Sequence, residues 1–61
     1  MKWVDIVPLG WAAFRLGESE SSMRLRIQAE KPNWARKNRR GWYEIDRPSF
    51  LEWLAVYKER R

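Results

Sequence analysis

Residues 33–45 read NWARKNRRGWYEI and carry the pattern of a β-hairpin with a basic turn. Trp34 and the run Trp42 to Ile45 offer the aromatic and β-branched side chains that are typical of strands. Between them, Asn38 and Gly41 tolerate the positive φ angles that tight turns require. The sequence therefore predicts two short strands, with Trp34 and Trp42 fixing the base of the hairpin to the core.

The turn of this hairpin is strongly cationic, because four of the five residues from 36 to 40 are Lys or Arg. At an isolated tip, these side chains can diverge into water and repel one another little. Such a wing can reach a phosphate backbone or a minor groove. The alternative is an edge hairpin that its charges keep soluble. We favour DNA contact, and the predicted wing contacts are Arg36, Lys37, Asn38, Arg39 and Arg40.

Upstream of the hairpin, the sequence predicts a strand and two closely spaced helices. Residues 2–7, KWVDIV, are rich in strand formers. Pro8 suits the first turn of a helix and Gly17 its end, and the apolar face at i, i+3, i+4, i+7 comprises Leu9, Ala12, Ala13 and Leu16. Ser19 can cap the second helix, with Ser21 or Ser22 as alternatives, and Lys31 and Pro32 end it. The gap of about three or four residues has the length of the turn in a helix-turn-helix.

After the hairpin, Asp46 or Ser49 can cap a last helix. Its predicted apolar face comprises Phe50, Leu51, Leu54 and Tyr57, with Trp53 beside them. The order of strand, helix, turn, helix, hairpin and helix predicts an α+β fold, a small winged helix-turn-helix that occupies residues 1–61 as one domain.

The second helix has a polar face that suits base recognition. At about 100° per residue, a core stripe on Met23 and Ile27 leaves an opposite face of Ser21, Arg24, Leu25 and Gln28. Arg can bridge guanine, Gln can bridge adenine, and Leu can touch a thymine methyl. Ser21 and Ser22 can donate to phosphate. The alternative is an ordinary solvated helix face. The predicted recognition-helix contacts are Ser21, Ser22, Arg24, Leu25 and Gln28.

Composition narrows the class of function. The chain has 61 residues and a net charge of +5, and residues 31–61, with nine basic and four acidic groups, carry all of it. A positive charge that is confined to one half of the chain indicates a polyanionic partner. The chain has no Cys and no His, which removes disulfides, Cys/His metal sites and the usual catalytic bases. We therefore expect no enzyme activity, no metal and no cofactor. The longest uncharged run, residues 6–14, is too short to span a membrane.

The first predicted helix is apolar on two sides. Trp11 and Phe14 project from nearly the opposite side to Leu9 and Ala13. The N-terminal strand or the closing helix could cover this second face. Otherwise Trp11 or Phe14 is exposed and could hold neighbouring monomers together.

Three segments resemble the excisionase-type winged helix of phage recombination directionality factors: WAAFRLGESESSMRLRIQAEKPNW, RRGWYEI and SFLEWL. That family has a short first helix, a Gly-x-Ser turn, a recognition helix with an apolar residue four positions after the Ser, a basic wing and a closing helix. The matching positions are Gly17, Ser19, Met23, residues 40–43 and residues 51–54. Winged helices of the mercury-resistance regulators and of Mu-type transposases and repressors are related.

The resemblance implies weak DNA binding by single monomers, cooperative assembly on tandem sites, DNA bending and recruitment of an integrase. The expected partners are therefore double-stranded DNA, an integrase and further copies of the chain. The expected setting is the cytoplasm of a bacterial or phage-infected cell, at the nucleoid. Within DNA binding, the alternatives are a small transcriptional repressor or a transposase DNA-binding domain. An alternative of another class is a protein-interaction module that docks on a host enzyme through its tryptophans.

Overall fold

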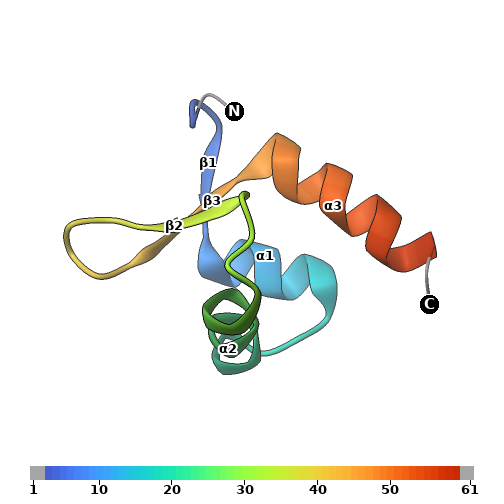
Figure 1. Ribbon diagram of the computed structural model, residues 1–61, viewed down its shortest axis with the longest axis horizontal. Coiled ribbons are helices and arrows are strands. Elements are labelled where there is room, and N and C mark those ends of the chain that lie inside the picture. Colours follow the sequence, from blue (N-terminus) through green and yellow to red (C-terminus); the bar gives the residue numbers. More distant parts are fainter. Residues whose placement is uncertain (1–2, 60–61) are drawn as a thin grey trace.

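The predicted elements form in the predicted order. The computed structural model describes residues 3–59 and contains three helices and a three-stranded antiparallel sheet (Figure 1). The elements are β1 (Ile6–Pro8), α1 (Leu9–Leu16), α2 (Glu20–Glu30), β2 (Ala35–Lys37), β3 (Tyr43–Asp46) and α3 (Arg47–Glu59). No helix within residues 3–59 is both long and apolar enough to cross a membrane.

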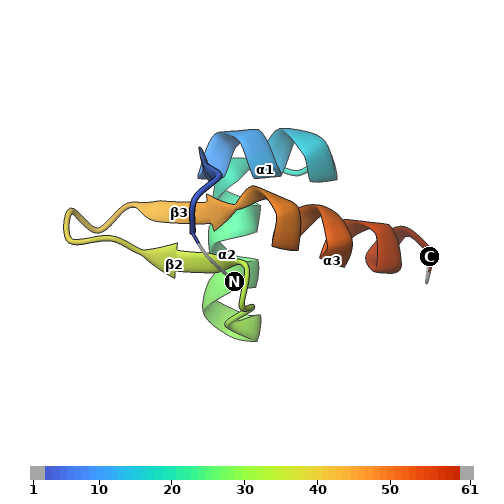
Figure 2. The ribbon, with the colours of Figure 1, turned by 90° about the horizontal axis from the view of Figure 1, so that it is seen from above.

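Strand β3 lies in the centre of the sheet, in the order β1-β3-β2. Val7 of β1 and Ala35 of β2 both pair with Ile45, which is fully buried. In Figure 1 the hairpin of β2 and β3 projects to one side and α3 to the other. Figure 2 shows α2 crossing the two hairpin strands at a steep angle.

The first strand is shorter than predicted. The prediction began at Lys2, which lies outside the described residues, whereas β1 begins at Ile6. Its partner β3 ends at Asp46, where α3 begins. Only the bond from the Arg47 N–H to the Asp5 carbonyl, at 2.9 Å, continues past the ladder. Of the described residues, Trp3 and Val4 therefore have no strand to pair with.

Pro8 differs from the prediction as well, because it is the last residue of β1 and the N-cap of α1. Pro8 faces Glu44 in the register, whereas the hydrogen-bonded pairs are Asp5 with Arg47 and, two residues on, Val7 with Ile45. An N–H at position 8 would point away from β3, so Pro8 costs the ladder no bond.

The ends of the first two helices follow the predicted signals. Gly17 has a φ of 82°, and its N–H donates to the Ala13 carbonyl. This left-handed geometry is readily available to glycine. Of the three candidate caps for α2, Ser19 is the one used, since its hydroxyl oxygen accepts from the Ser22 N–H at 3.1 Å. Only residues 17 to 19 separate the two helices, which confirms the predicted tight turn.

Aromatic rings form the centre of the core. Trp34 and Phe50 are fully buried, with ring centroids 5.0 Å apart in an edge-to-face arrangement. Trp11 packs on Phe50 and Trp53 packs on Trp34. The buried apolar residues are Leu9, Ala12, Ala13, Met23, Ile27, Trp34, Ile45, Phe50 and Leu54. A chain of this length holds together through aromatic contacts, each ring burying roughly 150–250 Å².

Two predicted core contacts are wrong. Trp42 does not fix the hairpin to the core, because it is 72% exposed. The first anchor, Trp34, lies just before β2, and its carbonyl accepts from the Asp46 N–H at 2.8 Å. Leu51 was placed on the buried face of α3 but is 37% exposed. Trp53 contacts the core in its place.

On the second apolar face of α1, one residue is covered by another helix and one is exposed to solvent. Trp11 is half-buried and packs on Phe50 of α3. Phe14 is 84% exposed. The closing helix therefore covers Trp11 and leaves Phe14 in water.

Candidate nucleic-acid interface

Helix α2 presents the predicted polar face to solvent. Met23 and Ile27 are buried, as predicted. Leu25, on the opposite side, is 67% exposed, and Ser21 and Gln28 are also exposed. The position of this face is therefore as the periodicity of the sequence predicted.

Two of the predicted helix contacts have partners within the protein. The Ser22 hydroxyl donates to the Glu18 carboxylate at 3.1 Å, and its N–H bonds to Ser19. Ser22 therefore stabilises the N-terminal end of α2 through bonds to the two residues that precede the helix or cap it. Arg24 lies 4.0 Å from the Glu20 carboxylate, with about half of its side chain exposed. A surface pair this long constrains the guanidinium only weakly.

The five predicted wing residues have different environments. Arg36 was expected to diverge into water, but its Nε donates to the Glu44 carboxylate at 2.9 Å, and its guanidinium lies 4.3 Å from the centre of the Trp3 ring. Cross-strand pairing explains the contact, since Arg36 faces Glu44 in the register of β2 and β3. The charge of Arg36 is therefore largely compensated within the sheet.

Asn38 organises the turn. Its side-chain oxygen accepts from the Arg40 and Trp42 N–H groups, at 2.9 and 3.0 Å. Its side-chain nitrogen donates to Glu44 at 3.4 Å. Of the two residues expected to tolerate positive φ, only Gly41 has one, at 82°. Asn38 thus contributes through its side chain, as Asn does in many turns.

The remaining wing cations are more accessible. Lys37, Arg39 and Arg40 are exposed. The Lys37 ammonium lies 5.7 Å from the centre of the Tyr43 ring. No ion pair within residues 3–59 involves any of these three side chains. The unpaired charge of the wing therefore comes from three residues at or beside its tip.

Two hollows lie between α2 and the hairpin, and Tyr43 lines both. The first, of about 600 Å³, has Glu20 and Arg24 on its helix side and Gly41 and Trp42 on its hairpin side. The second, of about 390 Å³, brings Gln28 and Lys31 opposite Arg36 and Lys37. We call these two hollows together the α2–hairpin surface. Four of the predicted contacts line it, Arg24 and Gln28 from the helix and Arg36 and Lys37 from the hairpin. The other six predicted contacts lie outside the hollows: Ser21, Ser22, Leu25, Asn38, Arg39 and Arg40.

Lys31, Trp42 and Tyr43 are among the residues of this surface that sequence reasoning missed. Lys31 continues the row of Arg24 and Gln28 at i, i+4 and i+7, so its spacing could have revealed it. The sequence predicts a strand for both Trp42 and Tyr43 and a core contact for Trp42. That both line the hollows follows only from the position of the hairpin relative to α2.

Arg26 lies on the other flank of α2 and has a structural role. Its Nη2 donates to Glu18 at 2.7 Å and its Nη1 to Glu30 at 3.2 Å. The guanidinium also lies 5.2 Å from the ring centre of Tyr57 and 5.8 Å from that of Trp53. The bond to Glu18 is the main cause that raises the pKa of Arg26, and burial opposes it. Arg26 therefore stays charged and ties α2 to α3.

Comparison of the chain with protein-family models, with curated proteins and with solved structures finds no match. The winged helix and the excisionase resemblance therefore stay predictions.

Proposed function

We propose that this protein binds double-stranded DNA as a winged helix, with α2 in the major groove and the β2–β3 hairpin at the neighbouring minor groove. The observation that carries the proposal is the α2–hairpin surface. Arg24 of α2, Lys31 at the C-cap of α2 and Lys37 of the hairpin line its hollows. Glu20 is the acid among the lining residues, and Arg39 and Arg40 lie in the hairpin turn. A concave, cationic surface of this kind attracts a polyanion.

Base recognition would come from the same helix face. Arg24 and Gln28 have the donors that bridge guanine and adenine edges, and exposed Leu25 can touch a thymine methyl. Phosphate contacts would come from Lys31 and the wing, which position the protein without reading sequence.

The role that we propose is architectural or regulatory and non-enzymatic, as in an excisionase. Such a protein would assemble on tandem sites and recruit an integrase. It would act at the nucleoid, in the cytoplasm of a bacterial or phage-infected cell. The sequence resemblance supports this role. A transcriptional repressor and a transposase DNA-binding domain would use the same surface.

A salt titration tests the proposal. Five accessible cations predict that log K falls with log salt at a slope of magnitude about 4.5, at about 0.9 for each phosphate contact. Binding of a duplex of random sequence should then weaken roughly 500-fold between about 50 and about 200 mM salt. Fluorescence anisotropy with a labelled duplex measures the binding constant at each of the two salt concentrations. Absence of binding at low salt, or binding that salt does not weaken, would refute DNA binding.

A second experiment separates the roles within DNA binding. Once a preferred site is selected from a random library, duplexes with one site and with tandem sites can be compared. An excisionase should bind the tandem duplex cooperatively and retain a purified integrase on it. A repressor or a transposase domain should show neither property.

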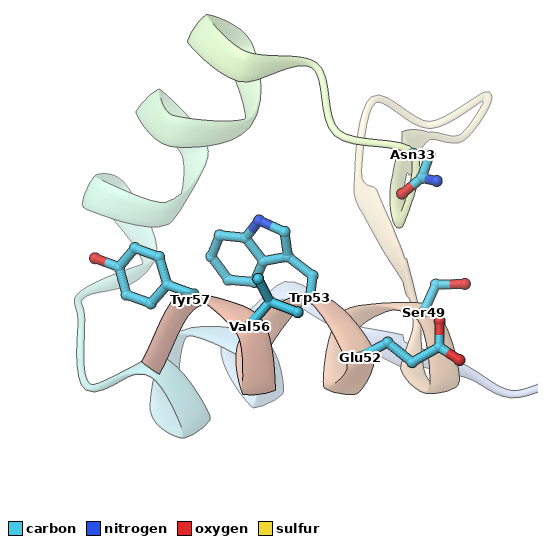
Figure 3. A pocket seen from close by; sticks show the side chains of 6 residues that line it. All are labelled: Asn33, Ser49, Glu52, Trp53, Val56 and Tyr57. Atoms are coloured by element: carbon cyan, nitrogen blue, oxygen red, sulfur yellow. The ribbon is translucent and has the colours of Figure 1, made fainter. Parts of the chain in front are cut away.

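A cleft on α3 favours a second candidate function, docking on another protein. Figure 3 shows Trp53, Val56 and Tyr57 along α3, with Asn33 near the opposite end of the opening. The cleft has a volume of about 420 Å³, and aromatic side chains commonly anchor protein interfaces. If docking is the function, the charge reversal Arg39→Glu/Arg40→Glu should leave partner binding intact, whereas Val56→Glu should abolish it.

A further inference from the structure

Trp42 is the tryptophan within residues 3–59 that lies mostly in water. It is 72% exposed, whereas Trp34 is fully buried and Trp3, Trp11 and Trp53 are half-buried. No aromatic ring or cation of the described residues lies against its indole. A large apolar ring kept in water forgoes the gain from burial, so its position needs a reason other than core packing.

The backbone at Trp42 is fixed in place. Its N–H donates to the Asn38 side-chain oxygen at 3.0 Å, and its carbonyl accepts from the Asn38 N–H at 2.8 Å. Gly41, just before it, adopts a left-handed φ of 82° and donates to the Asn38 carbonyl at 3.0 Å. Because folding already orders the backbone of this turn, little further backbone entropy is lost when a partner binds the Trp42 ring.

The surroundings of Trp42 favour an anionic partner. Trp42 and Arg24 line the same hollow, and Arg39 and Arg40 directly precede the Gly41–Trp42 turn. The acid in that hollow, Glu20, lies 4.0 Å from Arg24. An exposed ring among cations can contact a base or a sugar while its neighbours hold the phosphates.

We propose that Trp42 inserts its indole ring beside a base step of double-stranded DNA, from the minor groove, and thereby bends the duplex. This inference rests on the proposed DNA binding and adds the residue that deforms the DNA. Apolar side chains inserted in this way partly unstack a base step and kink the duplex, which lets more of the protein surface reach it. Flexible pyrimidine–purine steps are the sequences that such a wedge should prefer.

The test compares four proteins on one duplex that holds a single site and carries fluorophores at its two ends: the wild type, Trp42→Ala, Trp42→Phe and Phe14→Ala. Energy transfer between the ends reports bending, and anisotropy reports affinity. Phe14→Ala is the matched control, because Phe14 is also a highly exposed aromatic residue, 84% exposed, but lies on α1 outside the hollows. Thermal unfolding by circular dichroism checks that each variant folds.

Trp42→Ala should weaken binding roughly tenfold, as expected for loss of one aromatic stack on a base, and should remove the bend. Its salt slope should match that of the wild type, because no phosphate contact is lost. Trp42→Phe should keep most of the bend, and Phe14→Ala should change neither quantity.

Different results overturn different claims. If Trp42→Ala binds and bends duplex DNA like the wild type, the wedge is refuted while DNA binding stands. If Trp42→Ala weakens binding but leaves the bend unchanged, the ring contacts DNA without wedging a base step, and the wedge is also refuted. If the wild type binds no duplex at low salt, both proposals fall, and that result is visible before any variant is made.

Discussion

Arg39 and Arg40 allow the charge of the wing to be tested separately from its structure. Both side chains are exposed, and none of the ion pairs within residues 3–59 involves them. If each contacts one phosphate, the variant Arg39→Ala/Arg40→Ala loses two contacts and its salt slope falls by about 1.8. A fourfold rise in salt should then cost the wild type roughly twelvefold more affinity than it costs the variant.

A charge-matched control separates local contact from the overall field. Arg15→Ala/Lys58→Ala also lowers the net charge from +5 to +3, but it does so near the ends of α1 and α3, away from the hairpin (Figure 1). Its salt slope should stay close to that of the wild type. Anisotropy titrations at four or more salt concentrations give the slopes. All four side chains are exposed, so the unfolding free energy should change by less than about 0.5 kcal/mol for each substitution except Arg15→Ala. Arg15→Ala also removes a guanidinium that lies 5.1 Å from the centre of the Trp11 ring, and should cost about 0.5–1 kcal/mol. Equal slopes for the two double variants would show that total charge, and not the wing, drives binding.

Three further outcomes follow from the structure. Arg24→Ala and Gln28→Ala should each reduce discrimination between a selected site and random duplex by about 1–3 kcal/mol; equal losses on both duplexes in competition assays would leave these residues as phosphate contacts only. Arg26→Met should lower the free energy of unfolding by about 2 kcal/mol, because it removes charged hydrogen bonds and a cation–π contact. Arg24→Ala should lower it by about 0.5 kcal/mol or less, because it removes an exposed ion pair. Similar melting temperatures for Arg26→Met and Arg24→Ala would contradict this difference. Phe14→Ser, at an exposed position, should keep its melting temperature and single-site affinity but lose cooperativity on tandem sites, and a large drop in both would place Phe14 in the core.

Local signals predicted the helices well because each signal acts within one turn. Ser19 caps α2 through the N–H three residues later, and Gly17 ends α1 by its own φ. The buried pair Met23 and Ile27 follows from the 3.6-residue period. None of these inferences depends on a distant part of the chain, so the sequence alone carried enough information.

The errors lie where a distant segment decides the outcome. Trp34 and Trp42 both flank the predicted hairpin, yet only Trp34 reaches Phe50 and Trp53 of α3. Arg24 and Arg26 are two residues apart on α2, yet Arg26 meets Tyr57 of α3, whereas Arg24 lines a hollow with the hairpin. Periodicity places both arginines off the core stripe but does not tell which neighbour covers each flank. The course of α3 and the crossing of the hairpin determine that.

The hairpin can hold many cations because the residues that stabilise its fold differ from those that carry its exposed charge. Glu44 pairs with Arg36 and also accepts from Asn38, and Asn38, which is neutral, holds the turn closed. Lys37, Arg39 and Arg40 therefore contribute little to the shape of the turn. Substituting Arg39 and Arg40 changes the field and leaves the scaffold, whereas substituting Asn38 should disorder Trp42 and the tip with no change of charge. A loss of DNA bending in Asn38→Ala at an unchanged salt slope would therefore trace to the position of Trp42, and not to the strength of the wing field.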